Sequence, residues 1–298
     1  MSTVDPGFPV AGEVPLPTPG PTRTRSDRMD TLRRIFQSKT FIAGLIVLLF
    51  WTCAAIFGEH LTKSAYDSST DTLQGMSSSH WFGTDTLGRD VFARVIAGSR
   101  EIMIVAIFST ILGVIGGTVV GLITGYFSGT IDNSVSRVAD SILAIPLIIS
   151  AVTVVTALGG VSNVTLILVI GAIFTPLIGR TVRTAVLVER GLDYVQAAKL
   201  RGERAPYIMF VEILPNVTAP ILVEGTVRLG YSVFFISSLS FLGFGIEPPS
   251  PDWGAQVAAN YTLISFAWWT VLFPSLAIAS LVVSINLISD GITHVVEG

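Results

Sequence analysis

Long stretches with few or no charged residues alternate with short polar segments along most of this chain. The stretches lie at Thr40–Gly58, 102–131, 141–179, 217–245 and Trp268–Ser289. A helix needs about 20 apolar residues to cross the roughly 30 Å hydrocarbon core of a bilayer. Residues 141–179 are too many for one helix, and the turn-forming segment LGGVSN at 158–163 divides them into two. The pattern therefore predicts an all-α membrane protein with six transmembrane helices.

The composition agrees with this class. Of the 298 residues, 50% are apolar and 13% are charged, and the mean hydropathy is +0.69. A soluble domain would have about 25% charged residues. The single cysteine, Cys53, excludes an internal disulfide bond.

An even number of spans places both termini on one side of the membrane, and the basic residues indicate which side. With the N-terminus in the cytoplasm, most Lys and Arg residues are cytoplasmic, as the positive-inside rule requires. These residues are Arg23, Arg25, Arg28, Arg33, Arg34, Lys39, Arg137, Arg180, Arg183, Arg190, Lys199, Arg201 and Arg204. Trp268 and Trp269 then lie at the outer interface, where indoles are favoured. We expect a multi-pass plasma-membrane protein with cytoplasmic termini, and no nucleic-acid partner, because the basic residues face the membrane surface.

The ends and loops divide the chain into four parts. Residues 1–35 are rich in proline and then basic, so we expect a disordered cytoplasmic tail. The apolar run that follows is too long, and too far from the start, for a cleaved signal peptide. We expect the first transmembrane helix and an outer loop in residues 36–97, five further helices in 98–290, and a cytoplasmic tail in 291–298.

A polar loop at residues 189–215, cytoplasmic in this arrangement, has the pattern of two short helices. An apolar stripe over 189–201 consists of Leu192, Val195, Ala198 and Leu200. Gly202 is typical of a helix C-cap, because glycine adopts positive φ without strain. Pro206 suits the first turn of the second helix, which is expected to reach Leu214. Because Ala197 and Ala198 are small, the loop is either a docking site for another protein or an amphipathic connector on the lipid surface.

Five segments resemble one family. QAAKLRG at 196–202, followed by ILPN at 213–216, resembles the EAA…G…LP signature of permeases in binding-protein-dependent ABC importers. Four others resemble the dipeptide and oligopeptide permease C subunits: HWFGTDTLGRDVFARVIAG (80–98), GYFSGTID (125–132), SRVADSILAIP (136–146) and SLSFLGFGIEPPSPDWG (238–254). Together they cover nearly everything after residue 35.

The resemblance implies a type I ABC importer permease fold, in which the loop at 189–215 seats in a groove of a cytoplasmic ATPase. The implied coupling residues are Gln196, Ala197, Ala198, Lys199, Gly202, Leu214 and Pro215. The implied partners are a homologous permease, two ATPase subunits or domains and an extracellular solute-binding protein. Three positions depart from the family pattern: Gln196 replaces the usual Glu, Glu212 stands where His is common, and Ile236 stands where an acidic residue is frequent. We expect docking to survive the loss of charge at Gln196.

The sequence carries no motif for catalysis. It lacks the G-x-x-x-x-G-K-[ST] phosphate loop, the G-x-S-x-G nucleophile elbow and the H-E-x-x-H zinc motif. The chain is therefore not expected to be an enzyme, or to hold a metal or a cofactor. By the resemblance, ATP and Mg²⁺ bind to the partner ATPase subunits.

Two charges interrupt the fifth span. Glu224 and Arg228 are four residues apart, in the order that favours a helical ion pair, and so share a face. Charges at this depth are expected to face the bundle interior or a water-filled path. They either line the translocation path or form an internal pair that fixes helix packing, and the sequence leaves both interpretations open.

Three other segments carry structural expectations. The outer segment at 83–100 predicts an amphipathic helix capped by Thr84 or Asp85, with acidic groups paired to Arg89 or Arg94. In the second span, glycine recurs at every fourth position from Gly113 to Gly125, a spacing that favours close helix packing. The proline-rich segment GIEPPSPDWG after the fifth span predicts a rigid outer cap or re-entrant loop.

These features predict a permease subunit of an ATP-driven importer that moves di- or oligopeptides by alternating access. Nickel complexes or another small solute are the alternative cargoes. A stand-alone secondary transporter is a further alternative, although it would typically show inverted repeats and several ionisable groups at the midplane. A non-transporting scaffold would have no need for Glu224 and Arg228 within a span.

Overall fold

The computed structural model describes residues 36–246 and 249–297, and within them every regular element is a helix, as predicted. The α-helices are α2 (Lys39–Leu61), α3 (Val91–Tyr126), α4 (Thr130–Leu143), α5 (Leu147–Ala157), α6 (Asn163–Glu189), α7 (Asp193–Leu200), α8 (Ala205–Tyr207), α9 (Thr218–Leu239), α10 (Trp253–Asn260) and α11 (Trp269–Glu297). Two π-helical segments, η1 (Ile208–Ile213) and η2 (Ser240–Phe244), and a 3₁₀ turn, η3 (Tyr261–Leu263), complete the set. The tail predicted at 1–35 lies outside the described residues.

Among the described residues, five helices are long and apolar enough to cross a membrane: α2, α3, α6, α9 continued by η2, and α11. The third predicted span is not one straight helix. It is the pair α4 and α5, which meet at an angle of 88°. With 11 residues, α5 is only about 16 Å long, so six spans result only if the bent pair counts as one. At the C-terminal end, α11 continues through most of the tail predicted at 291–298.

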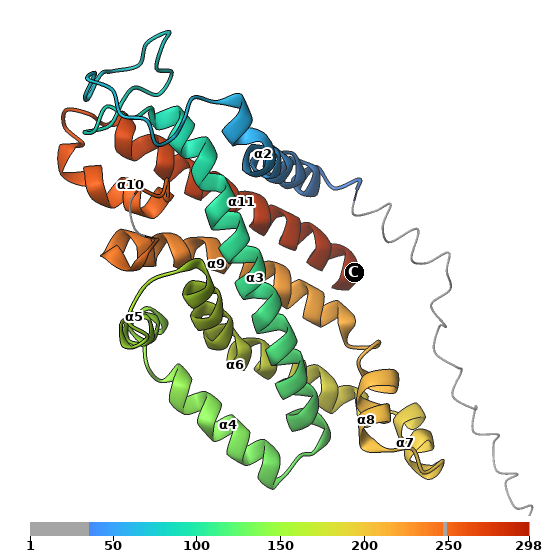
Figure 1. Ribbon diagram of the computed structural model, residues 1–298. Coiled ribbons are helices and arrows are strands. Elements are labelled where there is room, and N and C mark those ends of the chain that lie inside the picture. Colours follow the sequence, from blue (N-terminus) through green and yellow to red (C-terminus); the bar gives the residue numbers. More distant parts are fainter. Residues whose placement is uncertain (1–35, 247–248, 298) are drawn as a thin grey trace, which may run out of the picture.

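Helix α3 is the axis of the molecule (Figure 1). It has 36 residues and a length of about 54 Å, well beyond the roughly 30 Å of a hydrocarbon core. The predicted outer amphipathic helix and the second span are therefore one continuous element, and the expected boundary at 97/98 falls inside it. The predicted cap was wrong: Asp90, not Thr84 or Asp85, accepts the Ala93 N–H at 3.0 Å. Asp85 instead pairs with Arg89 at 2.7 Å.

Helices α3 and α6 pack at backbone contact, which confirms the glycine prediction. A Cβ built on Gly117 would lie 2.6 Å from Cβ of Ile178, and one built on Gly121 would lie 2.6 Å from Cβ of Val182. Real Cβ atoms do not approach so closely, so only glycine permits this helix separation. The fully buried side chains of Ile178 and Val182 belong to the hydrophobic core, and α3 and α6 therefore form a closely fitted pair.

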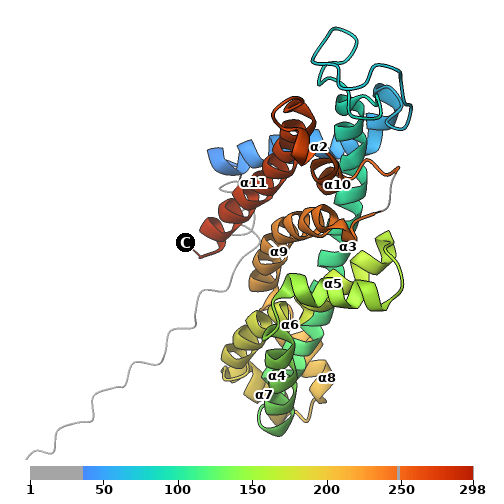
Figure 2. The ribbon, with the colours of Figure 1, turned by 90° about the vertical axis from the view of Figure 1, so that its left-hand side faces the viewer.

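The N-terminal end of α3 contacts the segments around α10, in the upper part of Figure 2. The Trp253 side chain is fully buried, donates from Nε1 to the Val95 carbonyl at 2.8 Å, and meets the Trp51 ring edge-on. Arg94 is buried and donates to the carbonyls of Ala65 (3.1 Å) and Ser250 (3.0 Å). The predicted outer cap is thus a short helix that returns into the bundle.

Candidate functional site

The loop between α6 and α9 forms a compact knob at the end of the bundle opposite α10 (Figures 1 and 2). It consists of α7, α8 and η1, so the predicted pair of short helices is confirmed. The first helix begins at Asp193 rather than at 189, because α6 continues to Glu189. The second begins with Pro206 in its first turn, and most of it is π-helical, a geometry that is rare and often marks functional sites.

Gly202 ends α7 as predicted. Its φ is +79°, a conformation in which a residue with a side chain is strained. The Gly202 N–H donates to the Lys199 carbonyl at 3.0 Å, and the Glu203 N–H donates to the Ala198 carbonyl at 3.2 Å. No heavy atom lies within 4 Å of the position that a Cβ would take at Gly202, so its outer side is open for another molecule.

The burial of side chains on α7 follows the predicted apolar stripe only in part. Val195 and Ala198 are fully buried, whereas Leu200 is 90% exposed and Leu192 is 45% exposed. Ala198 therefore lies against the rest of the chain and leaves the exposed surface to Gln196, Ala197 and Lys199. Leu200, at the end of this short helix, therefore supports no internal packing and is available for contact with another molecule.

Several side chains that the sequence did not single out hold the knob in place. Tyr194 donates its hydroxyl to Glu189 at 2.6 Å and accepts from Asn216 at 3.3 Å. Burial, together with the neighbouring Glu189 carboxylate, raises the pKa of Tyr194 well above its usual value. Arg201 pairs with Glu212 at 3.0 Å, so the residue at the family's His position takes part in an ion pair within the loop.

Leu214 and Pro215, both predicted as coupling residues, form the exit from the knob. The Leu214 N–H donates to the Met209 carbonyl at 2.9 Å, which is a π-helical bond. Pro215 is exposed, and its carbonyl accepts from the Thr218 hydroxyl at 2.9 Å, at the start of α9. These two residues therefore set the direction in which α9 leaves the loop.

Arg190 joins the knob to the end of α3. Its Nη1 group lies within hydrogen-bonding distance of the Gly125 carbonyl (3.3 Å), the Tyr126 carbonyl (3.0 Å) and the Ser128 hydroxyl (2.7 Å). The backbone carbonyl of Arg190 in turn accepts from Nε2 of Gln196 at 3.1 Å. An amide can donate this bond and a carboxylate cannot. This contact therefore depends on the glutamine that replaces the family's usual glutamate at position 196.

Glu224 and Arg228 form the ion pair that their spacing predicts. Nε and Nη2 of Arg228 lie 2.6 and 2.5 Å from Oε1 of Glu224, and the guanidinium also lies over the Tyr231 ring at 5.5 Å. Both side chains are largely buried, with 14% of Glu224 and 20% of Arg228 exposed. The pair satisfies itself within α9, which supports a packing role and leaves a role in the translocation path as a hypothesis.

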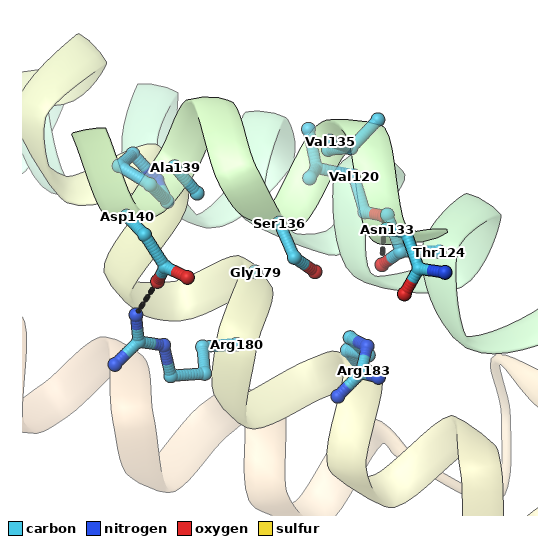
Figure 3. Close-up of a pocket in the computed structure, with 11 residues that line it drawn as sticks. Val120, Thr124, Asn133, Val135, Ser136, Ala139, Asp140, Gly179, Arg180 and Arg183 are labelled. Atoms are coloured by element: carbon cyan, nitrogen blue, oxygen red, sulfur yellow. Dashed lines mark hydrogen bonds and ion pairs between the residues drawn. The ribbon is translucent and has the colours of Figure 1, made fainter. Parts of the chain in front are cut away.

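A cavity of about 410 Å³ lies between α3, α4 and α6 near the α7 end of the bundle. Figure 3 shows Asp140 and Arg180 pointing toward each other across it, 2.5 Å apart. Asp132 and Arg183 form a second bridge from α4 to α6 through two bonds of 2.6 and 2.7 Å. In the sequence, Arg180 and Arg183 indicate only cytoplasmic charge, although Asp132 and Asp140 on the preceding segment offer matching partners. The Asp132–Arg183 bridge, in which Asp132 is buried, joins α4 to α6, whereas the exposed Asp140–Arg180 pair is expected to contribute little.

In the part of the chain that the structure describes, no three His, Cys, Asp or Glu side chains are grouped so that they could hold a metal ion. The described residues instead form an exposed knob, a tightly packed helix pair and a charge pair in a span.

Comparisons with known proteins show the family to which the chain is similar. Residues 117–298 match the family model described as binding-protein-dependent transport system inner membrane component, and residues 28–77 match the N-terminal TM domain of oligopeptide transport permease C.

Similar curated proteins cover almost the whole chain. The dipeptide transport system permease protein DppC of Alkalihalophilus pseudofirmus is 36% identical over 90% of this chain and 88% of its own length. The glutathione transport system permease protein GsiD of Salmonella typhimurium is 38% identical over 95% and 94%. The di/tripeptide transport system permease protein DppC of Pseudomonas aeruginosa is 32% identical over 89% and 91%. This chain is a multi-pass membrane protein that belongs to the family of binding-protein-dependent transport system inner membrane components.

Proposed function

We propose that this chain is one permease subunit of an ATP-driven importer of small peptides that works by alternating access. Its partners are a homologous permease subunit, two ATPase subunits or domains, and an extracellular solute-binding protein. ATP and Mg²⁺ bind to the ATPases, and this chain holds neither. The relatives named above for dipeptide, di/tripeptide and glutathione transport support a small peptide as the cargo.

The observation that carries this proposal is the knob formed by α7, α8 and η1. Leu200 protrudes from its tip, Gly202 leaves open space beside it, and Gln196, Ala197 and Lys199 are exposed on the same short helix. An amphipathic connector lying on lipid would turn a continuous apolar stripe outward. Here Val195 and Ala198, the centre of that stripe, are buried against the chain, so the exposed surface suits a protein groove better than a bilayer.

The charges at the same end of the molecule support a proposed orientation in the membrane. Arg190, Lys199, Arg201 and Arg204 lie in or beside the knob, which the positive-inside rule places in the cytoplasm. Trp268 and Trp269 lie at the other end of the bundle, at the start of α11. The N-terminus and the C-terminus are then cytoplasmic, and the knob faces the ATPases.

The first test is to purify the tagged chain in mild detergent and to identify the proteins that accompany it by mass spectrometry. We expect a second permease and ABC ATPases. Gly202→Arg should abolish recovery of the ATPases, because a long side chain projects from the docking face. Gly202→Asn is the matched control, since asparagine tolerates positive φ better than other side chains and remains short. Equal recovery of the ATPases with both variants would contradict docking at this loop.

A further inference from the structure

The C-terminal end of α3 is held by a side chain from the far end of α6. The last carbonyls of a helix have no partners within the helix, and in α3 two of them, Gly125 and Tyr126, accept from Arg190. A cation at this position also interacts favourably with the negative end of the helix dipole. Arg190 thus joins α3 to the residue at which α6 ends.

Arg190 is also the first residue of the short segment that connects α6 directly to α7. Residues 190–192 form this short turn, and Gly191 lies at its centre and is exposed. A force on α7 would bend such a turn unless the turn were braced. The bond from Nε2 of Gln196 to the Arg190 carbonyl closes the turn on one side, and the guanidinium binds the last carbonyls of α3 on the other.

A second contact of the same kind lies one turn further along α7. The ammonium group of Lys199 lies 5.7 Å from the centre of the Tyr126 ring, the last residue of α3, a geometry in which a cation is attracted to an aromatic face. The exposed surface of α7, which is the proposed docking surface, is therefore tied to the end of α3 through Gln196, Arg190 and Lys199.

The element held in this way reaches the opposite end of the molecule. α3 is unbroken from Tyr126 back to Val91, and its glycines pack against α6 at backbone contact. At its other end, the Val95 carbonyl accepts from Trp253. A continuous helix therefore connects the Tyr126 end of this pair with α10.

We propose that Arg190 is the positioning residue that transmits movement of α7 to the α3–α6 pair. This inference rests on the proposed function, because it requires an ATPase that moves α7. With Arg190 in place, α7 and the helix pair move as one body. Without it, the turn at 190–192 bends. Part of the movement that the ATPases impose on α7 then does not reach the transmembrane helices. The hydrogen bond from Tyr194 to Glu189 does not involve the Arg190 side chain, so we expect the knob to stay folded and docked in a variant that lacks it.

The test uses the whole complex reconstituted in proteoliposomes, with a radiolabelled dipeptide, the binding protein and ATP. The quantity measured is peptide taken up per ATP hydrolysed. We expect Arg190→Gln to assemble with the ATPases and to hydrolyse ATP, while this ratio falls by about 5-fold or more, within the range that a single coupling residue contributes. Arg180→Gln is the matched control: it removes the same charge from α6, but breaks only a pair whose side chains are 60% and 65% exposed.

Arg190→Lys is the second variant. Lysine keeps the charge and can donate to a carbonyl, but it lacks the planar fork of arginine, so the ratio should lie between those of Arg190→Gln and the wild type. A residue with a merely structural role would lower the yield of complex, the ATPase rate and uptake together, and the ratio would not change. An unchanged ratio in Arg190→Gln, or in Arg190→Lys if Arg190→Gln does not assemble, overturns the proposal. Failure of the proposed function would appear differently, as wild-type complex without ATP-driven uptake.

Discussion

Alanine at Gly117 should force α3 and α6 apart. The added Cβ would lie 2.6 Å from Cβ of Ile178, 2.7 Å from its Cγ2 and 2.9 Å from the backbone nitrogen of Gly179. Neither the Cβ nor the backbone nitrogen can rotate away, so the helices must separate. Overpacking of a core costs about 1–3 kcal/mol, and replacing glycine by alanine within a helix returns about 1 kcal/mol. Because backbone atoms are involved, we expect a net loss of about 1–2 kcal/mol.

Two further substitutions make this prediction specific. Gly116→Ala brings the new Cβ within 2.7 Å of Thr175 Oγ1 but leaves 3.5 Å to its Cβ, so adding Thr175→Ala should restore stability. Ile178→Ala should not rescue Gly117→Ala, because the clashing Cβ of residue 178 remains. Gly160→Ala is the control, since a Cβ there has no heavy atom within 4 Å.

The assay for these variants is the midpoint of thermal unfolding of the purified protein in mild detergent, followed by tryptophan fluorescence. The order of stability should be wild type and Gly160→Ala first, then Gly116→Ala, then Gly117→Ala. A Gly117→Ala protein as stable as the wild type would show that α3 and α6 are not in backbone contact, and would refute the view that they move as a unit.

Three other predictions address the knob, the span charges and the α10 end. Leu200→Asp should abolish recovery of the ATPases without lowering the amount of chain in the membrane, because the side chain is 90% exposed and supports no internal packing; unchanged recovery, measured by quantitative mass spectrometry, would contradict docking at this tip. If the Glu224–Arg228 pair serves packing, the double variant Glu224→Gln/Arg228→Gln should transport better than Arg228→Gln alone, because the single change leaves a largely buried carboxylate unpaired; equal loss of uptake in both would favour direct contact with cargo. Burial raises the pKa of Asp252 to about 6, whereas an unfolded chain has an Asp pKa of about 3.9. The folded protein therefore holds this proton more tightly, and the contribution of Asp252 to stability should fall as pH rises from about 4 to about 6 and stay constant above that. Thermal midpoints of Asp252→Asn should lack this slope, and a slope equal to that of the wild type would contradict the assignment.

The sequence allowed prediction of features that depend on local pattern. The lengths of the uncharged segments indicated where the transmembrane helices lie. Gly202 and Pro206 marked the break between the two short helices of the knob, because a positive φ favours glycine and the first turn of a helix favours proline. The spacing of Glu224 and Arg228 predicted their ion pair correctly for the same reason. These features involve residues within a few positions of each other.

Features that depend on tertiary contacts were missed. Arg94 and Glu101 suggested that the second span began after them, but Arg94 is satisfied by distant carbonyls and Glu101 accepts from Ser250, so α3 runs on through both. The uncharged run from 141 gave no sign of the bend before α5, where Pro146 has an extended ψ of 127°. Pro146 itself was the signal from which this bend could have been predicted. The bond from Arg190 to Gly125 joins residues 65 positions apart, and no local pattern indicates it.

Transport of small peptides by this chain, as part of an ATP-driven importer, can be measured directly. The most direct measurement is uptake of a radiolabelled dipeptide into proteoliposomes that contain the complete complex, with and without ATP and in the presence of the binding protein. We expect uptake against a gradient that requires both ATP and the binding protein and is lost in Gly202→Arg. Uptake driven by an ion gradient without ATP would contradict it and would identify the chain as a secondary transporter.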